Sequence, residues 1–240
     1  MIPLRDINPT RRVPVITVIF IAINVLVFLY EQTLSERNLT RLFLQYGVVP
    51  ARFFDGNLTL NDGLTLITSM FLHGGWLHVG GNLLYLWIFG NNIEDRLGAV
   101  RFIGFYLITG FVASALQIII EPSSRLPMIG ASGAIAGVLG GYIVLFPRAR
   151  VQTLIIFFIF VQVVSVPASW LLGWWFLIQL FNGVMSLGDY SSGGVAFFAH
   201  IGGFIAGVIL IRIFTVGRRP DDWWRPPRDP FARPRDRWWE

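Results

Sequence analysis

Six long apolar stretches restrict what this chain can fold into more than any other feature of its sequence. They lie near residues 13–31, 64–90, 100–120, 128–147, 151–185 and 193–214. A transmembrane helix needs about 20 mainly apolar residues, and these stretches provide that length. The chain is 54% hydrophobic and only 14% charged, with a mean hydropathy of +0.62. These values predict an all-α polytopic membrane protein rather than a soluble domain.

The placement of arginine predicts the orientation of the spans. By the positive-inside rule, Arg groups beside apolar stretches face the cytoplasm. These groups are Arg5, Arg11 and Arg12; Arg96 and Arg101; Arg148 and Arg150; and Arg212, Arg218 and Arg219. An even number of crossings must then lie between Arg150 and Arg212. We therefore expect residues 168–185 to cross as the fifth of six helices, 151–166 to lie at the cytoplasmic interface, and both termini to be cytoplasmic.

The remaining segments divide the chain around one membrane domain, residues 13–215. Residues 1–12 are a predicted cytoplasmic segment, and no cleavage pattern follows the first apolar stretch, which should remain as an anchor. The outer loop, about 32–63, mixes apolar and charged residues and predicts short amphipathic pieces on the bilayer surface. Residues 216–240 are rich in Arg, Pro and Trp, and predict a disordered cytoplasmic tail.

Composition excludes several kinds of site. The chain has no Cys, so disulfides, thiolate metal sites and cysteine nucleophiles are impossible. None of the 14 acidic residues falls within a predicted span, which excludes paired intramembrane aspartates, and there is no HExxH motif. The net charge of +5 reflects membrane topology rather than a basic face for nucleic acid. We predict no metal, no organic cofactor and no nucleic-acid partner.

All three histidines fall within the predicted spans, His73 and His78 in the second and His200 in the sixth. Polar side chains are costly in a bilayer, so each calls for a reason. His78 and Asn82 are four residues apart and share one helix face. Taken singly, such residues hydrogen-bond between helices more often than they line a wet cavity. Residue type alone also leaves metal binding by the three histidines open.

The motif Gly130-Ala131-Ser132-Gly133 opens the fourth span. It predicts Ser132 in the first turn of a helix, where free N–H groups and the helix dipole favour a developing anion. Small residues then recur every four positions on two spans: Gly133, Gly137 and Gly141 on the fourth, and Gly203 and Gly207 on the sixth. Such faces let helix backbones approach closely, which predicts Ser132 near His200. Ordinary tight packing with a passive serine is the alternative.

Together these residues supply what acyl transfer needs: a hydroxyl nucleophile, a histidine base, and side-chain donors for a tetrahedral oxyanion. Three motifs occur in order, namely His73-x4-His78-x3-Asn82, Gly130-Ala131-Ser132-Gly133, and Ala199-His200-x2-Gly203-x3-Gly207. In this respect the chain resembles the rhomboid intramembrane serine proteases, over about residues 60–215. The segment Glu94-Asp95-Arg96-Leu97-Gly98 also resembles that family's turn into the third span.

The resemblance implies a six-helix rhomboid-like bundle and a serine endopeptidase that cleaves single-pass membrane proteins in or near their transmembrane helix, without a metal or cofactor. It implies Ser132 as the nucleophile and His200 as the general base and acid. His78, Asn82 and the Ser132 N–H would stabilise the oxyanion, with Gly130 leaving room for it. His73, Gly133, Gly203 and Gly207 would be supporting residues. Helix five would form the substrate gate, with four aromatic residues facing lipid or substrate: Trp170, Trp174, Trp175 and Phe176.

Two positions depart from the family pattern, and one alternative function remains. Ala136 replaces a Tyr that packs beside the histidine in many members, and the first outer loop has no Trp-Arg pair. The alternative is a catalytically silent relative that binds transmembrane helices. A histidine-lined channel or carrier is disfavoured because the spans contain no acids. The exclusive use of Arg over Lys suggests a GC-rich genome, and with it a bacterial plasma membrane.

Overall fold

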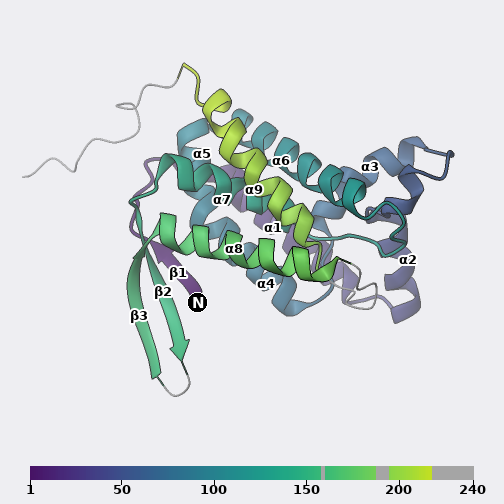
Figure 1. Cartoon of the computed structure of the whole chain (residues 1–240), viewed down its shortest axis with the longest axis horizontal. Coiled ribbons are helices and arrows are strands. Elements are labelled where there is room, and N and C mark those ends of the chain that lie inside the picture. The colour runs from purple at the N-terminus through teal and green to yellow at the C-terminus, as the bar shows by residue number, and fades with distance from the viewer. Residues whose placement is uncertain (158–159, 188–194, 218–240) are drawn as a thin grey trace, which may run out of the picture.

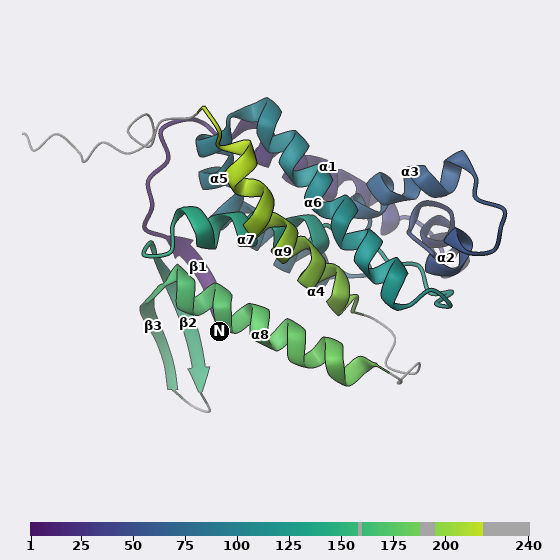
Figure 2. The same ribbon diagram turned by 45° about the horizontal axis from the view of Figure 1, so that its top comes forward.

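The computed structural model describes residues 1–157, 160–187 and 195–217, and the predicted disordered tail lies outside them for all but two residues. Helices dominate, and they pack around one short central helix (Figures 1 and 2). The elements in chain order are β1 (Ile2–Asp6), α1 (Val15–Glu31), α2 (Glu36–Tyr46), the 3-10 helix η1 (Pro50–Phe53), α3 (Leu60–Thr68), the 3-10 helix η2 (Ser69–Phe71), α4 (Trp76–Tyr85), the π-helix η3 (Leu86–Gly90), α5 (Asn91–Leu97), α6 (Ala99–Ile120), α7 (Ser132–Leu145), β2 (Arg150–Phe157), β3 (Phe160–Pro167), α8 (Ala168–Ser186) and α9 (Phe197–Phe214).

The central helix is α7, which lies between α6 and α9. Every residue from Ala134 to Tyr142 is buried. The helix is apolar around its whole circumference, as expected of a helix enclosed by protein on all sides. Three glycines in this stretch and Gly133 just before it give the helix a thin backbone profile, which lets its neighbours pack closely. The core is therefore centred on the helix that begins at Ser132.

Three helices in the described part of the chain are long and apolar enough to cross a membrane: α6, α8 and α9. α1 and α7 are apolar but shorter, with 17 and 14 residues. The prediction of one span over residues 64–90 is wrong in its first half, because α3 ends at Thr68 and a new helix begins only at Trp76. From there α4, η3 and α5 follow without a break. The count of six spans and their orientation remain predictions.

The all-α prediction is wrong for residues 150–157, 160–167 and the N-terminal segment. β2 and β3 form an antiparallel hairpin, and β1 pairs antiparallel with β2, so the strand order is β1-β2-β3. The hairpin sequence is rich in Val, Ile, Phe and Thr, which favour strands. The predicted boundary of the following helix is confirmed, because α8 begins at Ala168. The position of the hairpin at the membrane interface stays a prediction.

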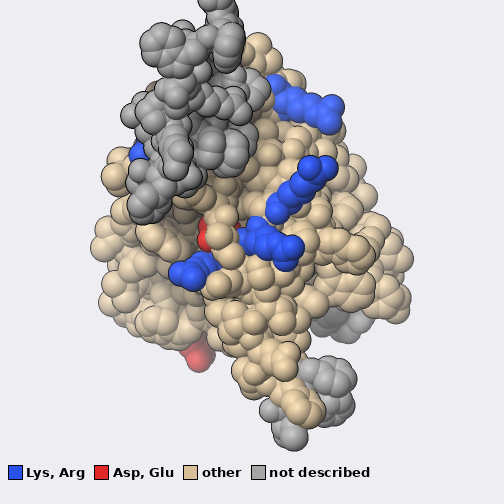
Figure 3. All heavy atoms as spheres, turned by 90° about the vertical axis from the view of Figure 1, so that its left-hand side faces the viewer, with Lys and Arg blue, Asp and Glu red and all other residues tan. Residues whose placement is uncertain are grey.

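Both ends of the described chain lie at the same end of the helix bundle (Figure 1). There Glu94 accepts hydrogen bonds from the N–H groups of Ile16 (2.9 Å) and Thr17 (2.8 Å), which start α1. Asp95 accepts from the backbone of the preceding segment. Gly98, with φ of 76°, makes the turn from α5 into α6, so the predicted turn is confirmed. Arginine side chains gather on this end (Figure 3), where the positive-inside rule predicts the cytoplasm.

Asp6 joins the sheet to the bundle and makes stability depend on pH. Its Oδ2 accepts hydrogen bonds from Tyr142 Oη and Asn92 Nδ2, each at 2.7 Å. Burial raises the pKa of Asp6 to about 6. The folded state therefore binds this proton more tightly than the unfolded chain, so the stabilisation is complete below the unfolded pKa of 3.8 and is lost as pH rises through about 6.

Asp6→Asn keeps an oxygen acceptor and cannot ionise. We expect its melting temperature to rise relative to the wild type as pH increases from about 4 to about 7. Thermal unfolding of both proteins in the same detergent across this range measures the difference. A difference that does not vary with pH would contradict the assignment.

Candidate active site

Ser132 stands at the start of α7, as the sequence predicts. Backbone contacts hold the preceding loop: Val48 pairs with Met128 as an isolated bridge, and Gly130 N–H donates to Ser69 O at 2.8 Å. The N–H of Ser132 is among the first four of the helix, which have no acceptor within the helix. This position combines a hydroxyl group, a free N–H and the positive end of the helix dipole.

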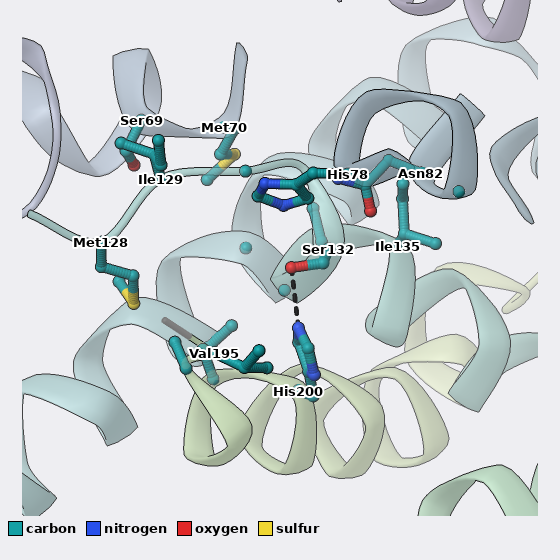
Figure 4. A pocket seen from close by; sticks show the side chains of 18 of the residues that line it. Ser69, Met70, His78, Asn82, Met128, Ile129, Ser132, Ile135, Val195 and His200 are labelled. Carbon is teal, nitrogen blue, oxygen red and sulfur yellow. Dashed lines mark hydrogen bonds between the residues drawn. The ribbon is translucent and has the colours of Figure 1, made fainter. Parts of the chain in front are cut away.

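The structure brings Ser132 and His200 together. Ser132 Oγ lies 2.8 Å from His200 Nε2, as Figure 4 shows. The two residues are 68 positions apart, and they meet because α7 and α9 are in backbone contact. A Cβ atom at Gly203 would collide with the carbonyl oxygen of Gly133, and one at Gly207 with that of Gly137.

The helix contact differs in one respect from the predicted pattern of small residues. Gly141 does not meet α9 backbone, since the nearest atoms to a Cβ there are the side chains of Phe105 and Ile211, at 3.1 and 3.2 Å. Gly140 takes that place, against the carbonyl of Phe204. The helices cross at an angle, so the contact moves from one helical row to the next as they diverge.

His78 and Asn82 direct side-chain nitrogens at the position beside Gly130. Gly74 N–H donates to His78 Nδ1 at 3.4 Å, which leaves the ring proton on Nε2. A Cβ built on Gly130 would lie 2.6 Å from His78 Nε2 and 3.7 Å from Asn82 Nδ2. Asn82 Nδ2 is buried and has no hydrogen-bond partner within the described residues. Gly130 has φ of 121°, so both its conformation and this free space require glycine.

His73 lies elsewhere than predicted. It is outside the second span, in the loop between η2 and α4, because the helix begins only at Trp76. Its backbone N–H donates to the buried carboxylate of Glu31, at 3.2 Å from Oε1. Its ring packs edge-on against His78, with centroids 5.0 Å apart. Neither ring nitrogen has a hydrogen-bond partner in the part of the chain that the structure describes. His73 thus contacts the site through His78.

Ser132 and His200 open into a cavity of about 530 Å³. His78, Asn82 and Gly130 also line it, so the five residues that the sequence assigned to catalysis or to the oxyanion share one space (Figure 4). Most of the rest of the wall is apolar: Met70, Leu77, Met128, Ile135, Leu139 and Val195. Among the described residues, no group of three or more His, Asp or Glu is arranged to hold a metal ion.

Two residues of α8 contact His200: Gln179, which was not singled out from the sequence, and Trp175, which was expected to face lipid or substrate. Gln179 Oε1 lies 2.8 Å from His200 Nδ1. The Trp175 ring lies beside the same imidazole in a tilted arrangement, with centroids 6.0 Å apart. Trp175 supplies an aromatic neighbour for His200, while Ala136 is a buried core residue. Gln179 is a polar residue within a span, so the rule that drew attention to the histidines could have found it.

The four aromatic residues of α8 divide into two pairs. Trp170 and Trp174 are 75% and 57% exposed, in line with the predicted lipid-facing or substrate-facing role. Trp175 and Phe176 are instead packed inward, and Phe176 stacks on Phe204 of α9 with centroids 4.7 Å apart. The helix turns through about 100° per residue, so neighbouring aromatic residues face in different directions.

The fold and the site together define a polytopic membrane protein in which a serine and a histidine from two helices face one cavity. The family profile described as Rhomboid domain matches residues 61–216. The chain belongs to the rhomboid family.

Known proteins that resemble the chain carry the same family name. RHOMBOID-like protein 4 of Arabidopsis thaliana is 32% identical over 72% of the chain and 39% of its own length. Rhomboid protease GluP of Bacillus subtilis is 31% identical over 53% of the chain and 24% of its own length. Rhomboid protein 1, mitochondrial, of Saccharomyces cerevisiae is 37% identical over 37% of the chain and 27% of its own length.

The chain therefore aligns with well under half of the length of these three relatives. They come from a plant, a bacterium and a yeast, so they do not support the bacterial origin inferred from arginine usage.

Proposed function

We propose that this protein is an intramembrane serine endopeptidase in which Ser132 is the nucleophile and His200 the general base and acid. The observation that carries the proposal is the 2.8 Å contact between Ser132 Oγ and His200 Nε2 at a cavity lined by His78, Asn82 and Gly130. The name of Rhomboid protease GluP, one of the relatives, describes a protease.

The chemistry follows from this geometry. His200 Nε2 takes the Ser132 hydroxyl proton as Oγ forms a bond to the scissile carbonyl carbon. The C–N bond then breaks, and the protonated imidazole gives its proton to the leaving amine. In the second half, water gives a proton to Nε2 and attacks the acyl carbon, and Ser132 leaves with that proton. No step requires a metal or an organic cofactor.

The carbonyl oxygen gains negative charge in both halves. Two side-chain donors, His78 Nε2–H and Asn82 Nδ2–H, lie beside Gly130, where we place this oxygen. We propose the Ser132 N–H, at the start of α7, as the third donor. Donors preorganised in a site shielded from water stabilise the transition state strongly. Gly130 leaves the space that this oxygen needs.

The proposed substrates are single-pass membrane proteins, cleaved in or near their transmembrane helix. The apolar wall of the cavity suits side chains from such a segment. A peptide bond in a regular helix is inaccessible to the serine, so the helix must unwind locally in order to reach it.

Labelling with a fluorophosphonate probe tests the proposal without knowledge of the substrate. The probe should label the wild-type protein in detergent, and neither Ser132→Ala nor His200→Ala. A folded wild-type protein that is not labelled would contradict the proposal and favour a relative that binds transmembrane helices without cleaving them.

The oxyanion donors make a separate prediction. His78→Ala and Asn82→Ala should each lower kcat by about 10²- to 10³-fold with a smaller change in KM, because their hydrogen bonds are stronger in the transition state than in the substrate complex. Steady-state kinetics in detergent measure this. A rise in KM alone would indicate ordinary substrate binding instead.

A further inference from the structure

His200 is held at both ring nitrogens. Nε2 faces Ser132 at 2.8 Å, and Nδ1 faces Gln179 Oε1 at 2.8 Å. A carbonyl oxygen of a glutamine side chain can only accept hydrogen bonds, so Nδ1 carries the proton of the neutral ring. The lone pair is then on Nε2, where it can accept the Ser132 hydroxyl proton. The opposite tautomer would place a hydrogen between Nε2 and Ser132 and could not act as a base.

We propose that Gln179 is a positioning residue that keeps His200 in its basic tautomer and orients its ring toward Ser132. This inference rests on the proposed protease function. Gln179 does not touch the reacting atoms, and it acts through the imidazole alone. The side chain is only 9% exposed, so water competes little for its oxygen.

The same contact matters more once the serine proton has moved. The imidazolium then donates from Nδ1 to a neutral oxygen, and a hydrogen bond to a charged donor is stronger than one between neutral groups. A carboxylate here would stabilise the cation further, but an ionised carboxylate within the bilayer is costly when it is unpaired. An amide oxygen orients the ring without burying a permanent charge.

α8 supplies two contacts to His200 from one face. Trp175 and Gln179 are four residues apart on α8, so they lie on one face of the helix. The Trp175 ring is tilted against the imidazole, and the Gln179 oxygen faces Nδ1. The other side of the helix is open, since Trp170, Trp174 and Phe181 are 57–75% exposed. The tautomer of His200 therefore depends on α8 lying against α9, as it does in Figure 2.

The test uses the full-length protein and compares Gln179→Met with Gln179→Glu. Met has a similar length but cannot accept the Nδ1 proton, so kcat/KM should fall by roughly tenfold. The acidic limb of the rate–pH profile should also move to lower pH by about one unit, because the cationic ring loses a partner. Glu restores an acceptor and adds charge, so its acidic limb should move to higher pH. His78 and Tyr85, which also line the cavity and titrate, are the same in all variants.

Gln117→Met is the matched control. Gln117 Oε1 accepts from the N–H of Ala199 at 3.1 Å, so this variant disturbs the residue beside His200 without touching the ring. It should leave the acidic limb where it is in the wild type. The inference would be overturned if Gln179→Met had the kcat/KM and the rate–pH profile of the wild type. It would also be overturned if the acidic limb moved as far in Gln117→Met as in Gln179→Met.

Two further outcomes separate this inference from the proposed function. If Gln179→Met does not fold, the rate–pH profile of Gln179→Glu tests the inference instead. An acidic limb in Gln179→Glu at the same pH as in the wild type would overturn the positioning role. Activity of the wild type, with none in Ser132→Ala, supports the proposed function whatever Gln179 does. A wild type that neither labels nor cleaves would overturn both.

Discussion

Replacing Ser132 or His200 with alanine is expected to lower kcat/KM for cleavage of a transmembrane substrate by at least about 10⁴-fold. Nucleophile and base act as a unit, so loss of either removes the covalent route. The double variant should be no slower than either single variant, for the same reason. Cleavage of a single-pass reporter by protein reconstituted in liposomes, followed by gel electrophoresis, measures the rates.

Ser114→Ala is the control for this experiment. Ser114 lies on α6, is 5% exposed and lines the same cavity, but the hydrogen bonds of the His200 ring go to Ser132 and Gln179. We expect its kcat/KM to stay within a few-fold of the wild type. Equal losses in Ser114→Ala and Ser132→Ala would contradict the specific role of Ser132, as would cleavage that survives in either alanine variant at Ser132 or His200.

Gly203→Val is expected to reduce stability by roughly 3 kcal/mol and to abolish labelling by the fluorophosphonate probe. A side chain at this position collides with the carbonyl oxygen of Gly133, the residue that follows Ser132. Backbone atoms cannot rotate away as a side chain can, so α7 and α9 must separate. Even a small separation would break the contact between Ser132 and His200. Thermal unfolding in detergent and probe labelling measure the two effects.

Gly173→Ala is the matched control for helix glycines. Gly173 lies on α8, and nothing among the described residues lies within 4 Å of an added Cβ. Alanine is the better helix former by about 1 kcal/mol, so this variant should be as stable as the wild type or slightly more so. The proposed role of the α7–α9 contact would be wrong if Gly203→Val matched Gly173→Ala in both measurements.

Much of the candidate site could be predicted because its signals are local. Ser132 follows two small residues and a proline-containing loop, which marks the start of a helix, and α7 begins there. His78 and Asn82 share a face through simple helical spacing. Glycines four residues apart on two spans predicted the close approach, and Gly203 meets Gly133 in the structure. Each of these predictions rests on residue spacing within one segment, or on the same glycine spacing in two segments.

The errors concern features that depend on contacts between segments distant in the sequence, which hydropathy along one segment does not report. The stretch 64–90 is mainly apolar, and hydropathy does not separate a membrane-spanning helix from an apolar loop packed among other helices. His73 was therefore assigned to a span although it lies before α4. Residues 150–157 and 160–167 form strands that pair with each other, and β1, about 145 residues earlier, pairs with β2. Such pairing between distant segments leaves no periodic signal in either one.

The amino-acid sequence was enough to predict a membrane-embedded helical protein, its family motifs, and the side chains available for a serine-based site. These follow from residue composition and from spacing along single helices, which need no knowledge of neighbours. The groups that surround His200 could be identified only once the packing of the helices was known. Gln179 and Trp175 reach it because α8 packs against α9, and the direction in which a residue faces in an almost wholly apolar helix depends on that packing.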